Sequence, residues 1–249
     1  MDDGCFFVIL FFNADGIAQD SVGVKLQPTI IEELVDPGQV FRSKLYVTNI
    51  SSSEKIYYLL ARDIDGLSAS GAPVFVDEGE QTDYALSSWI SFNQSSFSVG
   101  PNETKEIPFS VLVPRNAQPG AHFAGLFVSL KPPKPEFTGS GVGYEVATIV
   151  SLQVAGEITD EARIREFSTG KLIYTKAEVD FRVVVENLGN VLVRARGPLE
   201  ITDIFGKKVV TLVVNDQGAV VLPDSSREFK SVWNGEGLKI GRYQAVLGL

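Results

Sequence analysis

The stretch Phe41-Arg-Ser-Lys-Leu-Tyr-Val-Thr-Asn49 alternates apolar and polar residues, which is the period of a β-strand with one buried face. It has a counterpart later in the chain, Val179-Asp-Phe-Arg-Val-Val-Val-Glu-Asn187, which shows the same alternation and the same final asparagine. We expect both stretches to be strands, with Phe41, Leu45 and Val47 facing inward in the first copy.

Two further stretches are repeated in the same order along the chain. Pro101–Val111 is matched without a gap by Pro223–Trp233, and Gly120–Val128 is matched by Gly241–Leu249. No run of ten or more residues has the period of a helix. The sequence therefore predicts an all-β protein of two tandem immunoglobulin-like β-sandwiches, with very little helix.

The boundary between the two copies is expected at Gly156–Asp160. The first immunoglobulin-like sandwich then covers residues 22–156, and the second covers residues 157–249. Pro28 interrupts the first apolar run, and a proline is tolerated there only at a sheet edge or at a crossover between sheets. The Pro- and Gly-rich residues 131–143 are expected to form a long hairpin loop within the first sandwich.

Composition restricts the classes of partner. The 249 residues carry a net charge of −9 and contain a single cysteine, Cys5. An acidic chain without a cluster of Lys and Arg lacks the electrostatic footprint of a nucleic-acid-binding protein. One cysteine cannot form an internal disulfide, so we expect stability to come from the two apolar cores.

The N-terminal residues resemble part of a targeting segment. Cys5–Phe12 reads CFFVILFF, which is too short to span a bilayer and has the length of the apolar core of a signal peptide. We expect residues 1–21 to be a signal-peptide remnant, cleaved near Ala18 and packed in neither core; a buried first strand is the alternative. The chain stops in mid-strand at Leu249, so we expect its C-terminus to be truncated.

Catalytic motifs are absent from the sequence. A single histidine, His122, excludes a multi-histidine metal site, and there is no G-x-S-x-G, phosphate-binding glycine loop or C-x-x-C. His122 occupies the position of Tyr243 in the second copy, so we expect both to be structurally equivalent, largely buried and structural. The sequence predicts a protein that is not an enzyme and has no cofactor.

Asp63-Ile-Asp65-Gly66 resembles the opening of a calcium-binding loop. It lacks the later acidic ligand of such loops, although the acidic residues 77–83 are near in sequence. Asp63 and Asp65 are the candidate metal ligands, and a turn beside a solvated acidic loop is the alternative that we favour.

Aromatic residues of the first copy are candidates for ligand contact. Trp89, Tyr57, Tyr58 and Tyr84 could stack on sugar rings if they lie on an exposed face of the sandwich. Such residues more often belong to the core or to cross-strand pairs, so both interpretations stay open.

A family resemblance is carried by the turns and strands of the first copy. The stretch from Trp89-Ile-Ser-Phe through Pro114, followed by Gln118-Pro-Gly-Ala-His-Phe-Ala-Gly-Leu-Phe-Val128 and preceded by Asp36-Pro-Gly-Gln39, resembles the peptidoglycan-binding domain of WxL-interacting proteins and related bacterial immunoglobulin-like surface domains. The same pattern occurs across PapD-like sandwiches. The resemblance covers residues 22–156, and the second copy does not match the host-binding domain of that family.

The resemblance implies a bacterial protein that is secreted or sits at the cell surface. We expect it to bind cell wall (peptidoglycan) or another surface protein through its immunoglobulin-like domains, without catalysis. One alternative is a periplasmic chaperone-like or assembly module that pairs an exposed strand with a partner. Another is a pair of accessory domains of a larger surface enzyme. Anchoring to a membrane would require segments that this chain does not contain.

Overall fold

The computed structural model describes most of the chain as β-structure. The described residues are 23–68, 71–76, 80, 82–132, 145–171, 173–174, 178–235 and 241–249. They form sixteen strands, and their helical structure is limited to a 3-10 turn of three residues, Ser87–Trp89. The prediction of an all-β chain with very little helix is confirmed.

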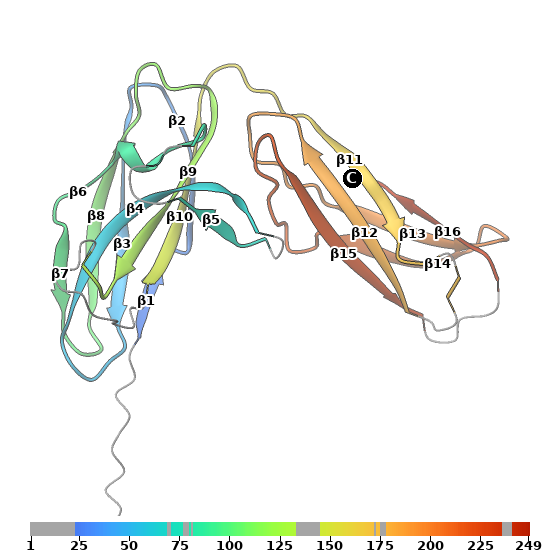
Figure 1. The fold of residues 1–249 in the computed structure, drawn as a ribbon, viewed down its shortest axis with the longest axis horizontal. Coiled ribbons are helices and arrows are strands. Elements are labelled where there is room, and N and C mark those ends of the chain that lie inside the picture. The colour runs from blue at the N-terminus through green and yellow to red at the C-terminus, as the bar shows by residue number, and fades with distance from the viewer. Residues whose placement is uncertain are drawn as a thin grey trace, which may run out of the picture.

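The first sandwich consists of two sheets (Figure 1). One has the strand order β1-β3-β8-β6, formed by β1 (Val24–Gln27), β3 (Val40–Asn49), β8 (Thr104–Leu112) and β6 (Ile90–Phe92). The other has the order β2-β10-β9-β4-β5, formed by β2 (Ile30–Val35), β10 (Glu145–Val154), β9 (Gly120–Ser129), β4 (Lys55–Leu67) and β5 (Pro73–Phe75), and β7 (Ser96–Val99) also pairs with β4.

Alternate residues of these two sheets form one apolar core. Leu45 and Val111 contribute from the first sheet, and Leu126 and Val150 contribute from the second. Phe41, which we expected to face inward with Leu45 and Val47, is only partly buried but packs against the same core.

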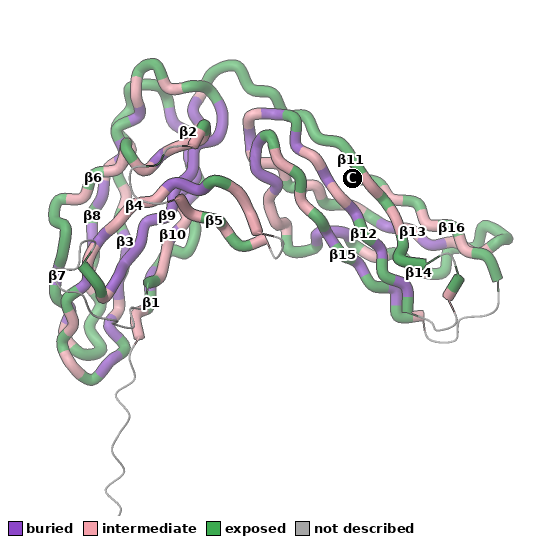
Figure 2. The backbone as a smooth tube through the Cα atoms, viewed as in Figure 1, coloured by how far each residue is buried: buried purple, intermediate pink, exposed green. Residues whose placement is uncertain are grey.

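The second sandwich is smaller. Its sheets have the orders β11-β12-β15 and β14-β13-β16, formed by β11 (Ala162–Thr169), β12 (Glu178–Asn187), β15 (Ser226–Asn234), β14 (Lys208–Val214), β13 (Gly197–Asp203) and β16 (Tyr243–Leu247). Its own core contains Val183, Ile201 and Trp233. Figure 2 shows buried segments running through both sandwiches.

The predicted sequence repeat is a structural repeat. β3 pairs antiparallel with β8 in the first sandwich, and β12 pairs antiparallel with β15 in the second. The asparagines that end the repeated strands, Asn49 and Asn187, are both buried. Each side-chain amide donates to the carbonyl oxygen four residues later, at Ser53 (2.8 Å) and Val191 (2.8 Å). The two copies therefore share both their strand pairing and a corner made by one asparagine.

His122 and Tyr243 lie at corresponding places near the start of β9 and β16. β9 pairs with β4, the strand after β3. In the same way, β16 pairs with β13, the strand after β12. His122 is buried, as predicted, but Tyr243 is only half-buried. The difference follows from sheet position, because β9 lies inside its sheet and β16 lies at an edge.

A third apolar cluster joins the two sandwiches at one end (Figure 1). Ile64, Ala121 and Phe123 come from the outer face of the β2-β10-β9-β4-β5 sheet, and Leu222 of the second sandwich is buried against them. Apolar area removed from water in this way favours a fixed arrangement of the two sandwiches.

Asn190 adds a set of hydrogen bonds at the junction. Its carbonyl oxygen accepts from Ala121 N (2.8 Å), and its Nδ2 donates to the carbonyl oxygens of Pro119 (3.0 Å) and Glu157 (3.0 Å). Its Oδ1 accepts from Thr159 N (2.8 Å). One residue of the second sandwich thus ties the start of β9 to the segment that connects the sandwiches.

Two of the sequence-based expectations fall on other parts of the chain. The signal-peptide remnant, residues 1–21, and most of the Pro/Gly-rich segment 131–143 lie outside the described residues. Within the described residues, no helix has the length and apolar character needed to cross a membrane.

Candidate functional site

The edge of the β2-β10-β9-β4-β5 sheet has a step. β10 pairs with β9 along its whole length, from Glu145 to Val154. On its other side β10 pairs in parallel with β2, but only from Ile149 to Val154. Among the described residues, Glu145–Thr148 is therefore hydrogen-bonded to a neighbouring strand on one side only, and β1, which belongs to the other sheet, packs close to β10.

The step exists because the chain changes sheets at Pro28. β1, before this proline, pairs antiparallel with β3 in one sheet, and β2, after it, pairs with β10 in the other sheet. Of the two positions expected for Pro28, a sheet edge or a crossover between sheets, the structure shows the crossover. The crossover leaves the first part of β10 without the partner that its second part has.

The backbone groups that face the step can be identified from the hydrogen-bond pattern. Ile149 N donates to Thr29 O at 3.0 Å, so the odd-numbered residues of β10 direct their N–H and C=O groups away from β9. Glu145 and Ala147 follow the same alternation, and no described residue forms a backbone hydrogen bond with them on that side. Such groups are ready to pair with another strand.

The side chains around the step are ordered by local contacts. Thr148 is buried and its Oγ1 donates to Pro28 O at 2.7 Å. Val146 is partly buried and packs against the first core. On the outer face, Glu145 pairs with Arg62 at 3.0 Å, and the guanidinium of Arg62 lies 4.7 Å from the centre of the Phe127 ring. The residues at the open edge are thus packed and hydrogen-bonded on their other sides.

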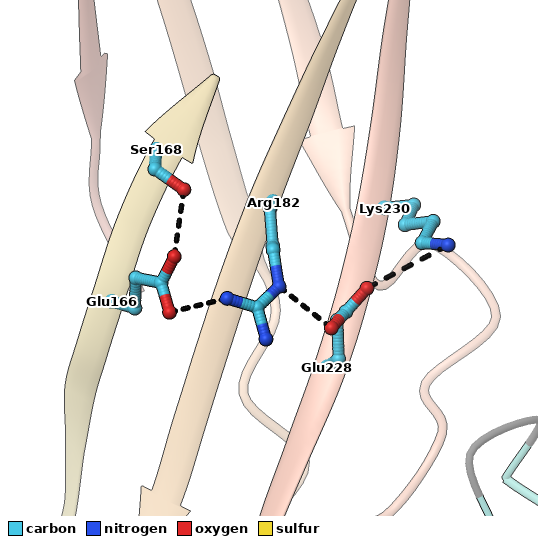
Figure 3. A network of polar contacts seen from close by, with 5 residues as sticks. All are labelled: Glu166, Ser168, Arg182, Glu228 and Lys230. Carbon is cyan, nitrogen blue, oxygen red and sulfur yellow. Dashed lines mark hydrogen bonds and ion pairs between the residues drawn. The ribbon is translucent and has the colours of Figure 1, made fainter. Parts of the chain in front are cut away.

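Edge strands of the second sandwich carry a larger set of charges. On the outer face of the β11-β12-β15 sheet, Arg182 donates to Glu228 at 2.7 Å and also to Glu166, and Lys230 lies 3.7 Å from Glu228 (Figure 3). The hydrogen bond from Arg182 lowers the pKa of Glu228. Charged side chains on an edge oppose pairing with another chain. Both edge strands of this sheet, β11 and β15, carry them, whereas the step on β10 carries one, Glu145.

A hollow of about 400 Å³ lies at the junction, beside β2. It is lined by Glu32, Glu33, Leu34, Ala121, Ser151, Gln153, Leu192 and Arg194. Arg194 of the second sandwich forms an ion pair with Glu32 in β2. This ion pair joins the second sandwich to β2 beside the hollow.

Asp63 and Asp65, the two candidate metal ligands, lie in β4 in different environments. Asp63 is buried, and its carboxylate accepts hydrogen bonds from Leu86 N (2.8 Å), Ser87 N (2.7 Å) and Ser87 Oγ (2.7 Å). Asp65 is exposed. Asp63 therefore holds the 3-10 turn, and within the described residues no group of three or more His, Cys, Asp or Glu side chains is placed to hold a metal ion.

His122 has structural contacts. Its Nδ1 lies 3.0 Å from Ala85 O and its Nε2 lies 3.0 Å from Gln118 O. Its ring centre is 4.5 Å from that of Trp89. Both ring nitrogens face backbone carbonyls, so the ring positions the segment before β9.

The four candidate aromatic residues are dispersed. Tyr57 is fully buried against Phe97, with ring centres 5.8 Å apart, and offers no surface to a ligand. Trp89 packs against the first core, and Tyr58 is half-buried in β4. Tyr84 stacks on Phe123 at the junction (5.8 Å). The structure does not gather them into one sugar-binding platform.

Sequence reasoning missed the open edge of β10. The sequence of β10 is that of a long apolar strand, but it carries no information about which side of the strand is paired. The signal that could have located the edge is Pro28, because a chain that switches sheets leaves a gap beside the strand that it joins.

Comparisons with known proteins give similarity at the level of the fold. No protein-family model matches the sequence, and no curated protein matches it. Among solved structures, the chain is similar to the class 5 fimbriae chaperone CfaA, with a TM-score of 0.46, 11% identity, and coverage of 91% of this chain and 100% of that one. It is similar to the E. coli chaperone DraB, with a TM-score of 0.42, 12% identity, and coverage of 90% of both chains.

The PapD-like domain 7 of human CEP192 is a third similar structure, with a TM-score of 0.36, 11% identity, and coverage of 62% of this chain and 99% of that one. The identities and TM-scores are too low to transfer a ligand or an activity, so the functional argument rests on the geometry of this chain.

Proposed function

We propose that this chain is a non-enzymatic binding protein whose first sandwich takes up an extended segment of a partner protein by strand addition at the start of β10. The observation that carries the proposal is the one-sided pairing of Glu145–Thr148. The outward N–H and C=O groups of Glu145 and Ala147 would form the first hydrogen bonds with the incoming strand.

The position of the step defines how the partner would lie. An incoming strand beside Glu145–Thr148 would continue the line of β2 within the same sheet. Its inward side chains would lie next to Val146, which is partly buried on the first core. An alternation of apolar and polar residues in the partner segment suits this position, because one face would meet the core and the other would meet water.

Two related assignments are part of the proposal. We propose that the domain boundary lies at Gly156–Asp160, because each strand pair lies on one side of this segment. The sandwiches are then residues 22–156 and 157–249. We also propose that the protein is exported from a bacterial cell and works at the surface or in the periplasm. The chain's net charge of −9 makes a nucleic-acid partner unfavourable.

A protein partner is favoured over peptidoglycan by the positions of the aromatic side chains. Stacking on a sugar requires exposed aromatic rings. Tyr57 is buried, and Trp89 and Tyr84 pack on neighbouring residues. The open strand edge does not need these rings. Of the interpretations open at the sequence level, strand pairing is the one that a feature of the structure supports.

The proposal is tested with a soluble, capped peptide of alternating valine and threonine flanked by lysines. Ala147→Pro removes one outward N–H and places a ring at the edge, so we expect peptide affinity to fall at least about tenfold. Ala147→Val is the matched control, because it keeps the N–H, and it should bind like the parent. Equal affinity for the parent and Ala147→Pro in titration calorimetry would contradict strand addition at this edge.

A further inference from the structure

The turn between β13 and β14 is fixed by one carboxylate. Asp203 Oδ1 accepts from Phe205 N (2.9 Å) and Lys207 N (3.0 Å), and Asp203 O accepts from Gly206 N (3.0 Å). Gly206 has φ +76°, a conformation that glycine adopts without strain. The turn is therefore a defined structure at the end of a paired hairpin.

This turn presents two large apolar side chains to solvent. Phe205 is 86% exposed and Ile204 is 62% exposed. Residues at such turns are usually Gly, Asn, Asp or Ser, and a tight turn does not require Ile or Phe. Because β13 begins near the junction and runs away from it, the turn lies at the end of the second sandwich that is far from the first (Figure 1). The protrusion is thus apolar, rigid and unobstructed by the first sandwich.

Cationic side chains surround the protrusion. Lys207 and Lys208 follow it directly, and Arg242 is exposed next to Tyr243, which pairs with Asp203. Two carboxylates lie beside these cations: Asp203 accepts hydrogen bonds from the backbone of the turn, and Glu200 pairs with Lys208 at 2.5 Å. Asp203 and Glu200 keep their negative charges, so Lys207, Lys208 and Arg242 exceed these two carboxylates by one positive charge, on a chain whose net charge is −9.

We infer that Ile204 and Phe205 form an insertion tip for an anionic lipid surface. A convex tip of two apolar side chains cannot enclose a ligand, but it can enter the boundary between headgroups and acyl chains. The adjacent lysines and Arg242 would then lie at the level of the anionic headgroups, where each cation is attracted. The contact is peripheral and reversible, and it is independent of the proposed strand addition at β10.

Vesicle sedimentation tests the inference on the whole chain. The probes are vesicles of phosphatidylcholine alone and of phosphatidylcholine with a third of phosphatidylglycerol. We expect retention on the anionic vesicles only, and weaker retention as salt is raised. Phe205→Ser should lower the partition coefficient about tenfold, since it removes most of the inserted apolar area.

Leu112→Ser is the matched control, because Leu112 is a comparably exposed (60%) apolar residue on the first sandwich. It should leave vesicle binding unchanged, and Phe205→Ser should leave the thermal unfolding midpoint unchanged because the side chain is exposed. The inference is overturned if the parent does not bind anionic vesicles, or if Leu112→Ser and Phe205→Ser lose binding equally. Failure of this test leaves the peptide experiment at β10 unaffected.

Discussion

At the scale of single residues, buried polar side chains identify the contacts on which each sandwich depends. Asn49 donates to three backbone carbonyls, those of Ser53, Val99 and Gly100. Asn187 has the equivalent role in the second copy, where its side-chain amide donates to the carbonyl oxygens of Val191 and Val221. Sequence alternation showed where these strands end. Apart from the carbonyls four residues later, at Ser53 and Val191, the partners of the amides lie far along the chain and could not be predicted from spacing.

Replacing either asparagine should unfold its sandwich more easily. We expect Asn49→Ala and Asn187→Ala each to cost about 2–4 kcal/mol, because several buried backbone groups lose their partner. Denaturant unfolding measures the loss. Asn93→Ala is the control, since Asn93 is exposed, and its effect should lie within about 0.5 kcal/mol. Equal effects at all three positions would refute the role of the asparagine corners.

Replacing Tyr57 should stabilise the first sandwich, in contrast to replacing the asparagines. Its ring is fully buried, its hydroxyl has no hydrogen-bond partner in the described part of the chain, and burial raises its pKa. Tyr57→Phe removes a polar group that is desolvated without compensation, so we expect stabilisation by about 1 kcal/mol and a rise of about 2–4 °C in the unfolding midpoint. Calorimetry that shows a lower midpoint would mean that the hydroxyl is satisfied.

At the scale of elements, the alternating pattern predicted the strands well because each has one buried face. β3, β8, β12 and β15 all lie within a few residues of the predicted stretches. The parallel pairing of β2 with β10 could not be predicted in the same way, since it joins residues more than a hundred positions apart. The start of β9 likewise depends on a loop of the other sandwich.

Gly120, at the start of β9, lies against the Asn190 loop of the second sandwich. Its φ is +116°, and a Cβ there would lie 2.4 Å from Asn190 O. We expect Gly120→Ala to destabilise the protein by about 2 kcal/mol or more, because strain and a clash with backbone act together. Gly170→Ala is the control, since a Cβ at Gly170 meets nothing within 4 Å. Indistinguishable unfolding curves for the two variants would contradict the close approach.

At the scale of the whole molecule, the two sandwiches are joined by an apolar cluster, the Asn190 contacts and a hydrogen bond between Tyr84 of the first sandwich and Asp224 of the second (2.5 Å). Burial and the contact with Asp224 raise the pKa of Tyr84 to about 12. The sequence indicated two copies, but the junction forms from loop residues that have no periodic pattern, so it was not predictable.

The raised pKa predicts how the junction responds to pH. Below pH 10, Tyr84 is protonated in both the folded and the unfolded chain, and its contribution to stability is complete. Between about pH 10 and 12 the unfolded chain loses this proton first, so the contribution declines. The stability difference between the parent and Tyr84→Phe should therefore shrink as the pH rises from 9 to 12, and a difference that stays constant would contradict the assignment.

The central claim, strand addition at the start of β10, is tested most directly by amide hydrogen exchange measured residue by residue. In the free protein, the outward amides of Glu145 and Ala147 should exchange faster than the amide of Ile149, which is bonded to Thr29. Adding the alternating valine–threonine peptide should slow exchange at Glu145 and Ala147 specifically. Slow exchange of these two amides in the free protein, or peptide-induced protection only at other edges, would contradict the account.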